Sequence, residues 1–253
     1  MYDDLKDRVV LVTGSSRGIG AGIALAFAQA GARVVLHGRD EAALAGVRHR
    51  VEASGARSSV VTGDVTSAAD LDRMRQRISD EYGPLDVLVA NAGSTNSRPM
   101  PIEEITEADW RSDVDLNLTA TFLTVKCFLP GMKQRGSGNI ITISSAAGRR
   151  ASAHTLVAYG AAKAGVQIFT QDLAAQVGPA GIRANCLAPE TILTDTNEAW
   201  IPPEQQEKLV HSHPVRRLGT PDDVARAALY LASDAAGWIS GVVLDIAGGA
   251  VLI

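Results

Sequence analysis

Near its start the chain reads Val9-Val10-Leu11-Val12-Thr13-Gly14-Ser15-Ser16-Arg17-Gly18-Ile19-Gly20. Its first part is a β-branched apolar run, which is typical of a strand buried on both faces of a sheet. An Ala-rich segment at 21–30 follows with helical spacing. Strand, glycine turn and helix together form a phosphate cradle, because glycines let the backbone approach a pyrophosphate and the helix N-terminus offers unpaired N–H groups. The Gly-x3-Gly-x-Gly spacing differs from the commoner Gly-x-Gly-x2-Gly, and such a turn can also be purely structural.

Strand-like and helical segments alternate along the whole chain. After the first strand, runs typical of strands occupy 33–37, 58–62, 85–90, 139–144, 183–188 and 242–246. Such alternation predicts a parallel sheet with helices on both faces, and right-handed crossovers favour the doubly wound Rossmann arrangement. We therefore expect an α/β fold with about seven strands, forming one domain over residues 1–253.

A tyrosine and a lysine stand four residues apart in Tyr159-Gly160-Ala161-Ala162-Lys163, a stretch that is typical of a helix. Residues at i and i+4 share a helix face, so the ammonium lies beside the phenol. A nearby cation favours the phenolate, which predicts a pKa for Tyr159 below its usual value of about 10. Taken alone, this spacing also fits an ordinary surface pair.

Two further strand ends carry small polar turns, Asn91-Ala92-Gly93 and Ser144-Ser145. The glycine turn comes first along the chain, then the Asn-Ala-Gly turn, the serines and Tyr-x3-Lys. In these motifs, their order and nearly its whole length, the chain resembles the short-chain dehydrogenase/reductase family, and its 3-oxoacyl carrier-protein reductases in particular. The resemblance implies hydride transfer between a nicotinamide dinucleotide and a carbonyl or secondary alcohol. It implies four catalytic residues: Asn117, Ser145, Tyr159 and Lys163.

The same resemblance implies where the cofactor lies. Asp64 is expected to read the adenine amino group, and the turn after 183–188 to grip the carboxamide. Glu190 stands there in place of the family's glycine, which puts the geometry of that turn in doubt and places a carboxyl group near the substrate mouth. The spacing from Ser145 to Tyr159 is one residue longer than usual. The implied cofactor-binding residues are Gly14, Ser15, Ser16, Arg17, Gly18, Ile19, Gly20, Arg39, Asp64, Val65, Asn91, Ala92, Gly93, Tyr159, Lys163, Pro189, Ile192 and Thr194.

The residues at the end of the second strand predict which of NAD(H) and NADP(H) the protein prefers. An NAD-preferring site places a carboxylate there for the adenosine ribose; here Gly38 stands at that point and Arg39 follows. Arg39 and Arg17 can hold a 2′-phosphate, so NADP(H) is the expected cofactor. NAD(H) is the alternative, since Asp40 can reach back to a ribose, although it is more simply the N-cap of a helix at 41–53.

Bulk properties exclude several classes of function. The chain has 253 residues and a formal net charge of −4, with acids and bases intermixed, which argues against a nucleic-acid partner. No apolar run approaches the roughly 20 residues of a membrane span, and no apolar signal segment begins the chain, so a cytoplasmic protein is expected. Cys127 and Cys186 are expected to be buried free thiols, and no metal site is expected.

One proline-rich segment, 194–219, breaks the alternation. Long loops often cover active sites, so we expect a substrate lid containing a short helix at 203–211; local packing through Trp200 and Leu209 is the alternative. Arg149, Arg150 and His154 fit either solvated loop residues or a rim that attracts an acidic substrate.

The helix that carries Tyr159 is apolar nearly all round, which predicts a homo-oligomer, with a tetramer expected. A small carbonyl or alcohol compound is the expected substrate, and the implied activity is that of a ketoreductase. The alternatives are an NAD(H)-dependent alcohol dehydrogenase and a catalytically silent dinucleotide-binding scaffold.

Overall fold

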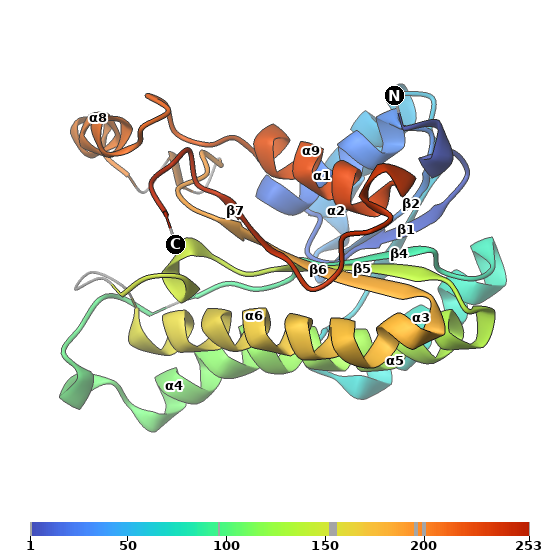
Figure 1. Ribbon diagram of the computed structural model, residues 1–253, viewed down its shortest axis with the longest axis horizontal. Coiled ribbons are helices and arrows are strands. Elements are labelled where there is room, and N and C mark those ends of the chain that lie inside the picture. The colour runs from blue at the N-terminus through green and yellow to red at the C-terminus, as the bar shows by residue number, and fades with distance from the viewer. Residues whose placement is uncertain (1, 96, 152–155, 195–196, 199–200, 253) are drawn as a thin grey trace.

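The computed structural model describes residues 2–95, 97–151, 156–194, 197–198 and 201–252. Seven parallel strands form one sheet in the order β3-β2-β1-β4-β5-β6-β7, as Figure 1 shows. This order is that of a doubly wound sheet, whose winding reverses between β1 and β4. The expected fold is confirmed. The strands are β1 (Val9–Val12), β2 (Arg33–Gly38), β3 (Ser58–Thr62), β4 (Val87–Ala90), β5 (Gly138–Ile143), β6 (Ile182–Pro189) and β7 (Val243–Ile246).

Helices cover both faces of the sheet (Figure 1). One face packs against α1 (Gly18–Gln29), α2 (Glu41–Ala53) and α9 (Pro221–Ala232). The opposite face packs against α3 (Ala68–Tyr82), α5 (Ala120–Arg135) and α6 (Val157–Val177), with α4 (Glu107–Val114) beside α6. The remaining helix, α8 (Pro203–Ser212), stands apart from the sheet, at the same end of the molecule as the start of α6.

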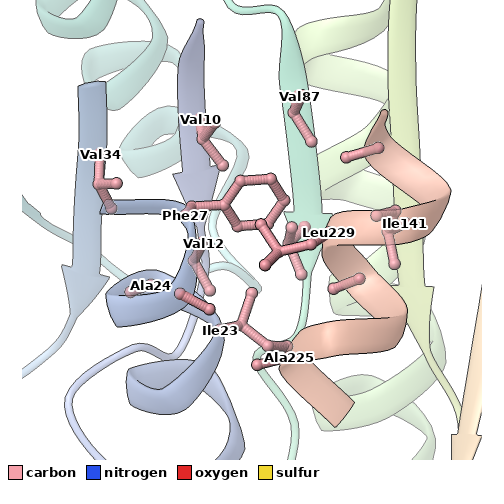
Figure 2. Close-up of a cluster of buried hydrophobic side chains, with 14 of the residues drawn as sticks. Val10, Val12, Ile23, Ala24, Phe27, Val34, Val87, Ile141, Ala225 and Leu229 are labelled. Atoms are coloured by element: carbon pink, nitrogen blue, oxygen red, sulfur yellow. The ribbon is translucent and has the colours of Figure 1, made fainter. Parts of the chain in front are cut away.

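The side chains of β1 alternate between two hydrophobic cores. Val10 and Val12 belong to the core under α1 and α9, whereas Val9 and Leu11 belong to the core under α3, α5 and α6. Figure 2 shows the first core, in which Phe27 lies between the strands and α9. Burial on both faces explains why the strand reads as an unbroken apolar run.

The glycine turn after β1 is set by steric constraints. Gly14 has a φ of +65°, in the left-handed region that favours glycine, and a Cβ at Gly20 would collide with the carbonyl oxygen of Gly14. Helix α1 begins at Gly18, three residues earlier than the Ala-rich run suggests. The last glycines of the motif therefore belong to the first turn of α1, where their N–H groups have no helical partner.

Parallel strands place their carboxyl ends at one edge of the sheet. The glycine turn, the 91–93 turn, Ser145 and the turn after β6 all follow these ends. Small differences from expectation occur at β4, which starts at Val87, and at β5, which stops at Ile143. The described helices include none that is long and apolar enough to cross a membrane.

Candidate active site

The glycine turn is held by a buried histidine that the sequence pattern did not single out. His37, in β2, accepts a hydrogen bond at Nδ1 from the Gly14 N–H (3.1 Å), and its Nε2 lies 3.2 Å from the carbonyl oxygen of Gly63. Burial lowers the pKa of His37, so the ring is neutral. The proton therefore sits on Nε2, and the ring ties the turn to the segment after β3. A histidine at the end of a buried strand is the only signal the sequence offers for this role.

The Asn91-Ala92-Gly93 turn is bonded directly to the glycine turn. Thr13 Oγ1 accepts from the backbone N–H groups of Asn91 and Ala92, both at 3.0 Å, and Asn91 Nδ2 donates to the carbonyl oxygens of Thr13 and Gly14. A Cβ at Gly93 would lie 2.7 Å from Asn117 Oδ1 and 3.3 Å from Lys163 Nζ. Only glycine fits here without displacing two polar side chains of the site.

Lys163 is buried, with 4 % of its surface exposed. Its Nζ donates to the carbonyl oxygen of Ile143 (2.9 Å) and lies 5.6 Å from the centroid of the Tyr159 ring. Burial lowers the pKa of Lys163 to about 8, because removal from water penalises the ammonium form.

The pKa of Tyr159 shifts in the direction opposite to that expected from the Tyr-x3-Lys spacing. Burial raises the pKa of the phenol, the side-chain hydrogen bond with Ser145 lowers it, and the charge of Asp113 raises it further. The expectation was wrong because it considered only the effect of the nearby Lys163 cation, whereas burial of the phenol has the larger and opposite effect on its pKa. At neutral pH the phenol keeps its proton.

The two serines after β5 have different roles. Ser144 is buried; its Oγ donates to the Lys163 carbonyl oxygen (2.8 Å) and accepts from Gln167 Nε2 (2.9 Å). Ser145 Oγ accepts from the Ala147 N–H at 3.1 Å, which leaves its hydroxyl hydrogen for another acceptor. Ser144 is thus occupied as a structural group, whereas Ser145 faces Tyr159.

Asn117 lies in a π-helical turn, Asp115–Thr119, between α4 and α5. Its Nδ2 donates to the carbonyl oxygens of Ser94 (2.7 Å) and Asp113 (2.9 Å), which fixes the amide orientation. Its Oδ1 is buried, and no described residue donates to it. Such π-turns often occur at functional sites, and the orphaned acceptor lies beside Gly93, close to Lys163.

The residues expected at the adenosine end lie at the carboxyl ends of β2 and β3. Asp64 Oδ1 accepts from the N–H (2.8 Å) and Oγ1 (2.7 Å) of Thr66, and these bonds, with the charge of Arg39, lower the pKa of Asp64. Val65 is buried; Arg39 and Arg17 are exposed. Asp40 caps α2 through Ala42 and Ala43, which confirms its role as an N-cap.

The turn after β6 reaches the glycine turn. A Cβ at Gly18 would lie 3.2 Å from Thr194 Cγ2, and Ile192 is buried and pairs with Gly219. Glu190, which was expected near the substrate mouth, instead accepts from His213 Nε2 at 2.7 Å. His213 was not considered in the sequence analysis, because a carboxylate and an imidazole 23 residues apart give no local signal.

One of the arginines expected near the rim, Arg149, has a different environment from the expected one. Arg149 is not a solvated loop residue, because it makes a two-bonded ion pair with Asp245 of β7 (2.9 and 3.0 Å). Arg150 donates to the Ala250 carbonyl oxygen, and His154 lies outside the described residues. Cys186 is a buried free thiol as expected, whereas Cys127 is only half-buried.

Comparisons with known proteins identify the family. A family model described as Enoyl-(Acyl carrier protein) reductase matches residues 14–251. The chain is 34 % identical over 247 residues to the 7alpha-hydroxysteroid dehydrogenase of Escherichia coli (strain K12), covering 98 % of this chain and 95 % of that protein. It is 36 % identical over 246 residues to the 3-oxoacyl-[acyl-carrier-protein] reductase of Chlamydia muridarum (strain MoPn / Nigg), covering 97 % and 98 %.

A solved structure agrees with this assignment. A 7 alpha-hydroxysteroid dehydrogenase complexed with NADH and 7-oxo glycochenodeoxycholic acid superposes with a TM-score of 0.92 at 34 % identity, covering 98 % of this chain and 96 % of that one. The chain therefore belongs to the short-chain dehydrogenase/reductase family. It is an oxidoreductase of the class that acts on alcohol and carbonyl groups with a nicotinamide dinucleotide.

Asp113, near the end of α4, is a buried acid that the sequence analysis missed. Only 1 % of its surface is exposed, Ser97 Oγ donates to its Oδ2 (3.1 Å), and its Oδ1 has no donor among the described residues. Its negative charge raises the pKa of Tyr159. The Asp113 charge therefore helps to keep the proton on Tyr159.

We expect Asp113→Asn to lower the pKa of Tyr159, because the variant removes the charge and keeps an acceptor for Ser97. If Tyr159 is the group that takes the proton in alcohol oxidation, the rise of kcat/KM with pH in that direction should move to lower pH. Asp115→Asn is the matched control, since Asp115 is an exposed acid two residues along the same helical stretch. Equal pH profiles for wild type and Asp113→Asn would contradict this electrostatic role.

Proposed function

We propose that this protein is a ketoreductase in which Tyr159 exchanges the proton with the substrate oxygen. The observation that carries the proposal is the grouping of Tyr159, Ser145 and Lys163 at the carboxyl ends of the strands, with the Tyr159 phenol hydrogen-bonded to Ser145 and its proton retained at neutral pH. A protonated phenol is a proton donor for carbonyl reduction, and it must lose that proton to act in alcohol oxidation.

The residues present fit a nicotinamide dinucleotide. The glycine turn leaves a cradle with unpaired N–H groups at the start of α1. A Cβ at Gly18 would lie 3.2 Å from Thr194 Cγ2, so the segment after β6 lies beside this cradle. Asp64, Val65 and the Asn91-Ala92-Gly93 turn would hold the adenosine side, and Pro189, Ile192 and Thr194 the carboxamide side. When bound, this group supplies or accepts a hydride.

The chain's own residues handle the proton and the charge on the substrate oxygen. Ser145 donates a hydrogen bond to that oxygen and stabilises the negative charge that develops there. Tyr159 donates its phenolic proton to the same oxygen. Lys163, held by the Ile143 carbonyl, keeps a positive charge near the phenol as it becomes a phenolate. Asn117 offers its unpaired Oδ1 beside Lys163, where a proton relay toward the lysine would pass.

The substrate that this site suits is an uncharged or weakly polar carbonyl compound. Arg149 is neutralised by Asp245, and Glu190 by His213, so neither presents a free charge to a substrate. We also propose that residues 1–253 act as one domain, with 194–219 as the lid. Helix α8 supports this, since none of its side chains is buried against the body of the protein.

Tyr159→Phe tests the proposed role directly. Loss of a general acid lowers the rate by about 10²–10⁴-fold, and we expect that drop in kcat with cofactor affinity within a few-fold of wild type. Ser145→Ala should lower kcat by about 10²–10³-fold, as for removal of one donor to an oxyanion. Tyr230→Phe, on exposed Tyr230 of α9, is the control. A Tyr159→Phe variant with wild-type turnover of a panel of ketones would overturn the mechanism; a wild type without turnover would support the silent scaffold.

We further propose a preference for NADP(H) over NAD(H). Gly38 ends β2 without a carboxylate, and the exposed guanidinium groups of Arg39 and Arg17 lie near the adenosine end. The alternative has support as well, because the superposed steroid dehydrogenase is complexed with NADH. Asp40 does not compete strongly for the ribose, since its Oδ1 caps α2.

Arg39→Ala should lower kcat/KM for NADP(H) by roughly ten- to hundredfold, as for loss of a hydrogen bond to a charged group. Efficiency with NAD(H) should hardly change. Arg57→Ala removes an exposed arginine at the opposite end of β3 and serves as the control. A wild type that prefers NAD(H), or a cofactor ratio unchanged in Arg39→Ala, would refute the assignment.

We propose that a second copy of the chain covers the outer faces of α5 and α6. Phe122 and Ile168 are 43 % and 55 % exposed, and Phe122 meets Phe169 edge-to-face with ring centroids 6.3 Å apart. Such an apolar surface is better buried, and a tetramer is the expected assembly. The C-terminal tail gives mixed support, since Val251 is buried and Leu252 is exposed.

Light scattering at micromolar concentration should give a mass several times that of one chain. Ile168→Lys combined with Phe122→Lys should reduce that mass, because charge on this surface opposes burial. A wild type that remains monomeric would contradict the proposal.

A further inference from the structure

A half-buried carboxylate and a buried imidazole join the two segments that frame the nicotinamide side of the site. Glu190 follows β6 directly, and His213 follows α8 directly. Their side chains meet at 2.7 Å (Oε2 to Nε2), with His213 only 2 % exposed. Glu190 Oε2 also accepts from the Thr191 N–H, and these bonds lower the pKa of Glu190 against the opposing effect of burial. The carboxyl is therefore ionised.

The ring of His213 needs a proton on both nitrogens. Its Nδ1 lies 2.6 Å from the carbonyl oxygen of Leu209, which can only accept, so Nδ1 carries a hydrogen. Its Nε2 faces an ionised carboxylate that already accepts from Thr191, so Nε2 carries a hydrogen as well. A neutral ring can satisfy only one of these two contacts. Glu190 and His213 thus form a partly buried, charge-assisted pair.

Among the described residues that hydrogen-bond to the His213 ring, Glu190 is the only charged one. Leu209 and Ser212 come from α8, and the remaining bonded partner is Glu190. On the C-terminal side, a Cβ at Gly248 would lie 3.4 Å from His213 Cδ2, and Val215 donates to the Gly248 carbonyl oxygen. His211 and Arg216 are nearby in sequence, but both are exposed.

The pair sits where α8 joins the body of the protein. Just beyond it, the Gly219 N–H donates to Thr191 O and the Leu193 N–H donates to Gly219 O, so the segment after His213 lies alongside the turn after β6. The side chains of α8 itself are not buried. At this end, α8 is attached through the Glu190–His213 bond, the short backbone pairing beside it and the bond from Val215 to Gly248.

We propose that Glu190 and His213 are positioning residues, which fasten the distal end of the lid helix α8 to the turn after β6 and so set the closed position of the lid over the substrate. Neither residue touches the reacting atoms. Glu190 acts through the turn that carries Ile192 and Thr194, and His213 acts through α8. This inference rests on the proposed function, in which α8 belongs to the lid.

The protonation of His213 is tested by nitrogen NMR of the histidine rings in the full-length protein at pH 7. We expect both ring nitrogens of His213 to carry protons, and Glu190→Gln to convert the ring to a neutral form. His211, two residues away and exposed, is the internal reference. A neutral His213 ring in the wild type would overturn the proposal, whatever the enzyme's activity.

The kinetic test uses Glu190→Gln, His213→Asn and the double variant, with His211→Asn as matched control. Each single variant should raise KM for the carbonyl substrate roughly tenfold, which corresponds to about 1.4 kcal/mol of lost anchoring, with kcat changed much less. The double variant should be no worse than either single one, because both remove the same bond. The proposal would be overturned if the increases in KM from the two single variants added up in the double variant. It would also be overturned if Glu190→Gln changed kcat as much as KM while His213→Asn changed neither. Thermal melting of each variant shows whether the chain still folds.

Discussion

The structure depends most on one costly arrangement, the burial of the Lys163 ammonium group. A lysine removed from water is stabilised only by the groups that surround it, and the described structure gives Nζ one hydrogen bond, to the carbonyl oxygen of Ile143. Ile143 is the last residue of β5, at the edge of the sheet where the strands end. The doubly wound topology thus provides the acceptor, and α6 provides the charge.

Other parts of the site follow from this arrangement. Ser144 bonds the backbone of Lys163 and so fixes α6 against the end of β5. Gly93 lacks a side chain because Lys163 Nζ and Asn117 Oδ1 fill the space beside it. Tyr159, one turn earlier on α6, is held with its phenol against Ser145. A helix, two strand ends and a π-turn are all arranged around one cation.

The sequence was sufficient for the fold, which rests on local patterns, and the residues that it named as a site lie close together in the structure. Unbroken β-branched runs predicted the buried strands. The glycine turn indicated a place where the backbone packs too closely for a side chain, and the structure shows such close packing between Gly14 and Gly20. What escaped prediction depends on contacts between distant segments. His37 bonds Gly14, Asp113 acts on Tyr159, and Glu190 meets His213, and no spacing along the chain reveals such pairs. The direction of the Tyr159 pKa shift failed for a similar reason, since burial is a property of the packed molecule.

The stability of Lys163→Met as a function of pH tests most directly whether a buried cation is the constraint behind this site. Burial lowers the pKa of Lys163 to about 8, whereas an unfolded lysine has a pKa of about 10.4. Below pH 8 the lysine is protonated in both states, and burial of the ammonium destabilises the folded state relative to the unfolded one. The free energy of unfolding of the wild type therefore rises between about pH 8 and 10.4, as the folded state loses this proton first. Denaturant unfolding at pH 7 should show the methionine variant, inactive, to be more stable by on the order of 3 kcal/mol, with the gap narrowing toward pH 10. A variant less stable than wild type at pH 7, or a gap independent of pH, would contradict the account.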